Sequence, residues 1–183
     1  AEVSRSTKLT QTTLKRYVTL LETLFLVYRL PAWARNPAKR LVKSPKVYLP
    51  DSGLLAHLAG WDTDFLEQAL GLPGALTETY VLGELLKHLA FTEKRLRLWH
   101  YRTQSDIEVD FILENPQGQI TGIEIKSSQS LSVKDFKGLK HLQATESKQF
   151  KRGIVMYTGR EILQFGDNLW AVPVSVWWGP PTE

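Results

Sequence analysis

Three extended, largely apolar runs stand between two helical patterns, and this succession limits the fold more than any other feature of the chain. Asn115-Pro116-Gln117-Gly118 has the composition of a hairpin turn between the second run and the third. The pattern predicts strands at residues 96–103, 107–114, 119–127, 153–158, 161–165 and 169–174, and helices at 52–59, 64–70, 73–91 and 133–146. A helix, three strands, a second helix and further strands predict an α/β fold in which a mixed sheet is flanked by helices.

The first 50 residues differ in charge from the rest of the chain. They hold ten Lys and Arg against two Glu, a net charge of +8, whereas residues 51–183 have a net charge of −4. Such a division predicts two units with different partners, the first facing a polyanion such as DNA. A solvated basic surface would give the same charge pattern and stays open as the alternative.

The order of elements in residues 1–50 is typical of the second half of a winged helix. Thr10 or Thr12 can cap a helix, and two extended runs, 26–34 and 41–49, then flank the turn at Asn36-Pro37. The chain begins with Ala inside this motif, so we expect a piece of a longer protein. If the unit binds DNA, the expected contacts come from its basic side chains: Lys15, Arg16, Arg35, Lys39, Arg40, Lys43 and Lys46.

Composition excludes several classes of site. The absence of Cys removes disulfides, thiolate nucleophiles and Cys-based zinc sites. No apolar run approaches the roughly 18 residues of a membrane span, and we expect no membrane partner and a cytoplasmic location. The phosphate-binding pattern Gly-x-x-x-x-Gly-Lys-Ser/Thr does not occur, so this chain alone is not expected to hydrolyse ATP by that mechanism.

Charged residues stand within two of the apolar runs. Asp110 lies in the second run, and Glu124 and Lys126 lie two residues apart in the third, on one face of the expected strand. A hairpin could bring Asp110 beside Glu124, and paired carboxylates can hold a hard cation such as Mg²⁺, or Mn²⁺ as a substitute. The alternative is that Glu124 and Lys126 lie on an edge or one-sided strand whose polar face meets water. Two further matches to the pattern, Asp135-Phe-Lys137 and Glu146-Ser-Lys148, lie on the polar side of an amphipathic helix, where a solvated surface explains them.

A further carboxylate, Glu78, projects into the apolar sector of the helix at residues 73–91. A buried carboxylate needs a cation, a hydrogen-bond network or access to water, because an unpaired one costs several kcal/mol. Glu78 therefore belongs either to the same site as Asp110 and Glu124 or to the solvated start of its helix.

These residues resemble the C-terminal region of a prokaryotic AAA-type ATPase family, in which a P-loop module precedes a winged helix and a domain of unknown function. That last domain resembles the restriction-endonuclease-like PD-(D/E)xK nuclease fold. The matching stretches are residues 41–60, 77–89, 99–113, 122–128, 134–139 and 153–178. The resemblance implies a partial winged helix at residues 1–50 and a nuclease-like domain at 51–183. Its site would use Glu78, Asp110, Glu124 and Lys126, although Val109 stands where the motif has proline and Glu78 lies between two threonines.

Three hypotheses follow for the function. The first is a Mg²⁺-dependent nuclease-like domain, in which Asp110 and Glu124 bind the metal, Glu78 completes the site and Lys126 positions the attacking water. The second is a catalytically inert platform that binds DNA or protein and regulates the missing ATPase module. The third is a protein-interaction domain at residues 51–183, with the basic hairpin packed against that module.

Overall fold

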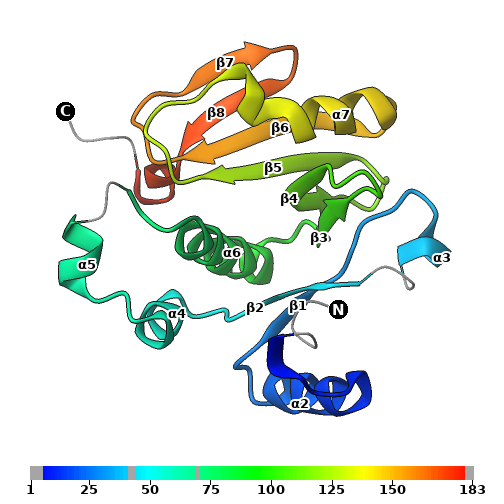
Figure 1. Ribbon diagram of the computed structural model, residues 1–183. Helices are drawn as coiled ribbons and strands as arrows, with labels where there is room; N and C mark the ends of the chain where they lie inside the picture. The colour runs from blue at the N-terminus through cyan, green and yellow to red at the C-terminus, as the bar shows by residue number, and fades with distance from the viewer. Residues whose placement is uncertain (1–5, 41–43, 69–70, 180–183) are drawn as a thin grey trace.

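The computed structural model describes residues 6–40, 44–68 and 71–179 (Figure 1). The α-helices are α2 (Gln11–Thr23), α3 (Pro37–Arg40), α4 (Ser52–Ala59), α5 (Thr63–Gln68), α6 (Gly74–Phe91) and α7 (Lys137–Thr145), with 3-10 helices η1 (Val133–Phe136) and η2 (Val174–Trp178). The strands are β1 (Tyr28–Leu30), β2 (Lys46–Tyr48), β3 (Arg97–Arg102), β4 (Glu108–Glu114), β5 (Ile120–Lys126), β6 (Phe150–Tyr157), β7 (Leu163–Gly166) and β8 (Leu169–Pro173).

Six strands form one mixed sheet in the order β3-β4-β5-β6-β8-β7. The pairs β3–β4, β4–β5 and β7–β8 are antiparallel, whereas β5–β6 and β6–β8 are parallel. The parallel pair β5–β6 needs a crossover, which η1 and α7 supply. The predicted α/β class, a mixed sheet flanked by helices, is therefore confirmed.

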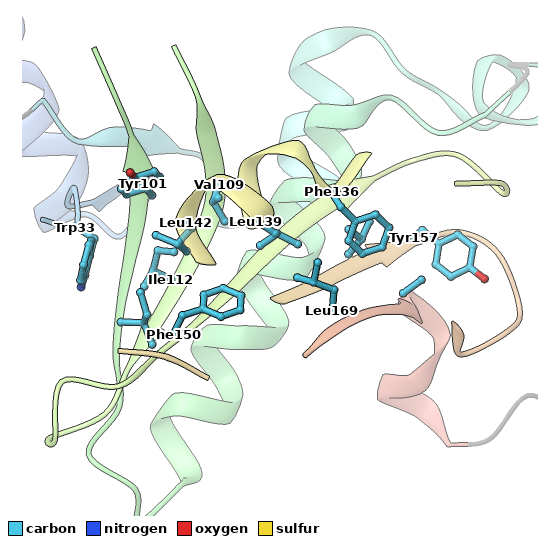
Figure 2. Close-up of a cluster of buried hydrophobic side chains, with 13 residues drawn as sticks. Trp33, Tyr101, Val109, Ile112, Phe136, Leu139, Leu142, Phe150, Tyr157 and Leu169 are labelled. Carbon is cyan, nitrogen blue, oxygen red and sulfur yellow. The ribbon is translucent and has the colours of Figure 1, made fainter. Parts of the chain in front are cut away.

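Each face of the sheet is covered by one helix, as Figure 1 shows for α6 and α7. On one face, Val81, Leu82 and Leu85 of α6 pack against alternate residues of the central strands. On the other face, Leu139 and Leu142 of α7 pack in a second cluster, drawn in Figure 2. The central strands of the sheet are thus covered on both sides, whereas the edge strand β7 is largely exposed.

The N-terminal segment is joined to the edge of this sheet. The backbone N–H of Trp33 donates to the carbonyl of His100 in β3, and the N–H of His100 donates to Pro31. Trp33 lies in the same apolar cluster as Leu139 and Leu142 of α7, and Figure 2 shows it beside the strand that carries Tyr101. The predicted units 1–50 and 51–183 therefore share buried contacts, and their boundary stays a prediction.

Most of the predicted elements occur within a few residues of their expected limits. Asp51 caps α4 by accepting a bond from the N–H of Leu54, and Gly60 ends that helix in the left-handed conformation. Thr10, of the two candidates, caps α2. Asn36-Pro37 was expected to form a simple turn, but Pro37 instead begins the one-turn helix α3, whose start suits the fixed φ of proline.

A buried ion pair holds α3 against the sheet. Both terminal nitrogens of Arg40 donate to the carboxylate of Glu114, at 2.8 and 2.7 Å, and the two side chains are only 13% and 10% exposed. The guanidinium also lies over the rings of Trp33 and Trp99, 5.5 and 4.7 Å from their centroids. Burial alone would raise the pKa of Glu114, but the bonds from Arg40 and Trp33 outweigh it and lower that pKa.

Arg40→Ala should lower the free energy of unfolding by about 3–5 kcal/mol, because it leaves the Glu114 charge buried and unpaired. Arg35→Ala is the matched control. Arg35 is 60% exposed in its pair with Glu146, so its loss should cost about 1 kcal/mol or less. Urea denaturation of the three proteins measures both values, and equal losses would contradict the importance of the buried pair.

Candidate functional site

An extra residue in β4 sets the direction of Asp110. Trp99 of β3 pairs with Ile112 and Tyr101 pairs with Val109, so two residues of β4 stand opposite His100 alone. This irregularity is a β-bulge, which reverses the alternation of side chains along the strand. As a result, Phe111 packs on the α6 face while Val109 packs on the α7 face, although they are two residues apart.

The bulge also changes how Asp110 bonds to the neighbouring strand. The β4–β5 pairs run only as far as Phe111 opposite Ile123. Beyond that point, the N–H of Ile125 donates to Oδ2 of Asp110 at 2.9 Å, so a side chain takes the role of a main-chain acceptor. Asp110 is thereby held at the place where the two strands separate, next to the position of Glu124.

Lys46 connects Asp110 with other polar side chains on the α6 side. Nζ of Lys46, in β2, lies 3.1 Å from Oδ1 of Asp110 and 3.3 Å from Oε1 of Glu78 in α6. The hydroxyl of Tyr48, also in β2, donates to the same oxygen of Glu78. Glu108 is more distant, with Oε2 3.8 Å from the Lys46 ammonium. Glu78 and Asp110 therefore converge, and the group between them is an ammonium.

The charge states in this cluster follow from its composition. Burial favours the neutral amine of Lys46, but Asp110 and Glu78 outweigh it and raise the pKa of Lys46 above its ordinary value. Burial and the charge of Glu78 raise the pKa of Tyr48, so the phenol keeps its proton and donates. The two carboxylates thus share one ammonium as their positive partner, and Glu78 also accepts a hydrogen bond from a neutral hydroxyl.

Glu124 and Lys126 lie on the α7 side of β5, as strand alternation predicts, since Ile123 and Ile125 between them pack against α6. Nζ of Lys126 is 2.9 Å from Oε1 of Glu124, but Oε2 of Glu124 is buried and has no hydrogen-bond partner in the part of the chain that the structure describes. Burial, together with the charge of Asp110, raises the pKa of Glu124 to about 7. Burial lowers the pKa of Lys126, yet the adjacent Glu124 outweighs it and the net pKa is raised, so this group stays an ammonium.

A pocket of about 330 Å³ opens beside this pair. Its floor depends on a close approach of α7 to β4, because a Cβ on Gly138 would stand 2.1 Å from the carbonyl oxygen of Glu108. The pocket is lined by Asp106, Ile107, Glu108, Glu124, Lys126, Lys134, Asp135, Lys137 and Gly138. Asp135 and Lys137, which matched the Asp-x-Lys pattern and were explained as solvated surface, therefore border the same pocket as Glu124.

The basic residues predicted to contact DNA have different environments. Lys15 and Arg16 on α2 and Lys39 on α3 are exposed. Arg35 pairs with Glu146, and Arg40 is buried against Glu114, so a DNA contact from Arg40 would require that pair to open. Lys46 is directed onto the carboxylates, and Lys43 lies outside the described residues. The DNA contact stays a prediction, supported most directly by the three exposed side chains.

Sequence reasoning did not assign Tyr48 or Glu108 to the site. The signal for Tyr48 is its spacing of two from Lys46, which places both side chains on one face of β2. Glu108 has the same spacing from Asp110, but the bulge between them breaks the alternation on which such an inference depends.

Carboxylate oxygens such as those of Asp110 and Glu124 are the ligands that a hard cation prefers, but two side chains alone do not fill its coordination sphere. Within residues 6–40, 44–68 and 71–179, no group of three or more acidic or His side chains is arranged to hold a metal ion. The charge of Asp110 acts on Glu124, and Oε2 of Glu124 has no donor among the described residues. Mg²⁺ is often held by only one or two carboxylates, with water and substrate phosphate as the other ligands, so the pair fits that mode of binding.

The fold and site define a mixed α/β domain with a cluster of carboxylates and lysines at the end of two antiparallel strands. The model of a domain of unknown function, DUF4143, matches residues 73–177, and that of a second, DUF8612, matches residues 1–64. The chain therefore belongs to the DUF4143 family.

Similar proteins include an uncharacterized protein of Mycobacterium tuberculosis, Rv2008c, and one of Mycobacterium bovis, Mb2031c. Each is 34% identical over 175 residues, which is 96% of this chain and 38% of the relative. This chain thus spans well under half the length of these relatives. No solved structure matches it. Among the described helices, none is long and apolar enough to cross a membrane.

Glu124→Gln should make stability less sensitive to pH between about 4.5 and 7. An ordinary glutamate in the unfolded chain loses its proton near pH 4.5, whereas Glu124 in the folded chain keeps its proton to about pH 7. In this window the folded state binds more protons, so the free energy of unfolding of the wild type falls as pH rises. Relative to wild type, the variant should gain stability from pH 4.5 to 7 and then keep a constant difference. Urea denaturation at a series of pH values without divalent cations tests this, and a constant difference throughout would contradict it.

Proposed function

We propose that this domain is a Mg²⁺-dependent nuclease-like domain that acts on DNA. The observation that most supports it is the buried Oε2 of Glu124, which lies under the influence of the Asp110 charge and has no hydrogen-bond partner among the described residues. The charge of Asp110 raises the cost of ionising Glu124, and a divalent cation would offset that cost. The restriction-endonuclease-like fold expected from the resemblance belongs to the same proposal.

Each residue has a distinct role in this proposal. Asp110 and Glu124 would hold the cation, which supplies a Lewis acid for the phosphate and lowers the pKa of bound water. Asp110 is oriented for this by the N–H of Ile125. Lys126, already an ammonium, stabilises negative charge on the phosphate rather than removing a proton from water. Glu78, bonded to Tyr48 and Lys46, keeps Lys46 directed at Asp110.

The N-terminal unit would bind the DNA backbone and connect the domain to an ATPase module. The exposed side chains Lys15, Arg16 and Lys39 support the first part of this proposal. The second part rests on the resemblance and agrees with the greater length of the relatives, of which this chain covers 38%.

Cleavage of plasmid and branched DNA with Mg²⁺ or Mn²⁺ tests the proposal. The wild type should cleave, and Glu124→Gln and Asp110→Asn should each lose about a hundredfold or more of the rate, as expected for removal of a transition-state charge interaction. Glu146→Gln is the matched control, because Glu146 also stands two residues before a lysine but pairs with Arg35 away from Asp110. Cleavage by Glu124→Gln at the wild-type rate would exclude catalysis at this site.

One observation favours a second candidate, an inert platform that binds DNA or protein without cleaving it. The ammonium of Lys46 lies between Asp110 and Glu78, where it already supplies a positive charge to the carboxylates. In that case the acidic cluster is a structural feature that holds β2 on the domain, and no divalent cation is required.

Thermal unfolding of Lys46→Met with and without Mg²⁺ separates the two candidates. If Lys46 permanently replaces the cation, Mg²⁺ should leave the midpoint of the wild type unchanged but raise that of Lys46→Met, since Asp110 and Glu78 then lack a positive partner. If the nuclease proposal holds, Mg²⁺ should stabilise the wild type as well, by about 2.7 kcal/mol at a hundred times its dissociation constant. Lys39→Met, at an exposed position, should behave as the wild type in either case.

A further inference from the structure

Two of the three lysines that line the pocket beside Glu124 make no ion pair with the carboxylates around them. Glu124 is paired with Lys126, and Asp106 and Glu108 both bond to Arg102, at 2.9 Å in each case. Asp135 accepts bonds from the N–H and the hydroxyl of Ser132 as part of the capping box of η1. Each carboxylate that lines the pocket therefore has a partner.

Lys134 and Lys137 remain, and both are exposed at the rim. Within the described part of the chain, neither side chain makes an ion pair or a hydrogen bond. They come from η1 and the first residue of α7, which Gly138 holds close against β4. Two ammonium groups at the rim are thus left without a carboxylate partner, on an element that packs directly against β4.

We infer that Lys134 and Lys137 form a binding site for the phosphodiester backbone of a nucleic acid, next to the Asp110–Glu124 pair. The site takes oxyanions, since two ammonium groups face the same pocket as Lys126. A strand that lies along α7 would place one backbone phosphate on these lysines and an adjacent one beside Lys126. The site is distinct from the basic surface of α2 and α3, and it rests on the proposed function because it positions substrate for the same carboxylates.

Binding of a short DNA duplex, measured over a range of salt concentrations with Ca²⁺ present to prevent cleavage, tests this inference. Lys134→Gln/Lys137→Gln should bind more weakly, and the slope of log affinity against log salt should fall by roughly 1.8, the value for two lost phosphate contacts. Lys94→Gln/Lys151→Gln is the matched control, because both lysines are exposed outside the pocket and away from α7, and the net charge changes equally. In cleavage assays with Mg²⁺, the pocket variant should raise KM and leave kcat near the wild-type value.

The outcomes distinguish the two proposals. If both double variants lose equal affinity, only overall charge matters and the pocket is not a binding site. If the wild type binds and cleaves DNA and the pocket variant does so equally well, the inference is wrong and the nuclease proposal stands. If the wild type neither binds nor cleaves DNA, the proposed function fails and the inference fails with it. Circular dichroism checks that each variant is folded.

Discussion

The bulge in β4 is the constraint on which the rest of the site depends. A regular strand would direct Asp110 toward α7, away from Glu78 and Lys46 on the α6 side. The extra residue opposite His100 reverses the alternation, so Asp110 bonds to the N–H of Ile125 and to Lys46 at once. Bulges commonly re-aim a side chain beside a functional site, and here one carboxylate links two faces of the sheet.

This arrangement divides the acidic residues into two electrostatic environments. On the α6 side, the ammonium of Lys46 bonds to Glu78 and Asp110, and the hydroxyl of Tyr48 donates to Glu78. On the α7 side, Glu124 has Lys126 for one oxygen and nothing for the other, which burial makes costly. The first environment is self-sufficient, whereas the second would gain from a bound cation. Because of this difference, the response of a Lys46 variant to Mg²⁺ distinguishes the two candidate functions.

The contacts between the N-terminal segment and the sheet affect the same site. Arg40 with Glu114 and Trp33 with His100 fix residues 31–40 along β3, and β2 then carries Lys46 to the end of β4. Part of the positive charge of this segment is thus paired within the chain, with Glu114, Glu146 and Asp110. The basic surface that this segment exposes is smaller than a count of its lysines and arginines indicates.

The sequence by itself determined the α/β class, the position of most helices and strands, and the common face of Glu124 and Lys126. These features follow from local periodicity, caps and turn residues, which act over a few positions. Only the tertiary structure decided the direction of Asp110, the position of Lys46 between two carboxylates, and the border of the pocket at Lys134 and Lys137. The bulge depends on pairing with another strand, and Lys46 is 64 residues from Asp110 in the chain. Such contacts depend on how distant segments pack, and no local pattern of residues carries that information.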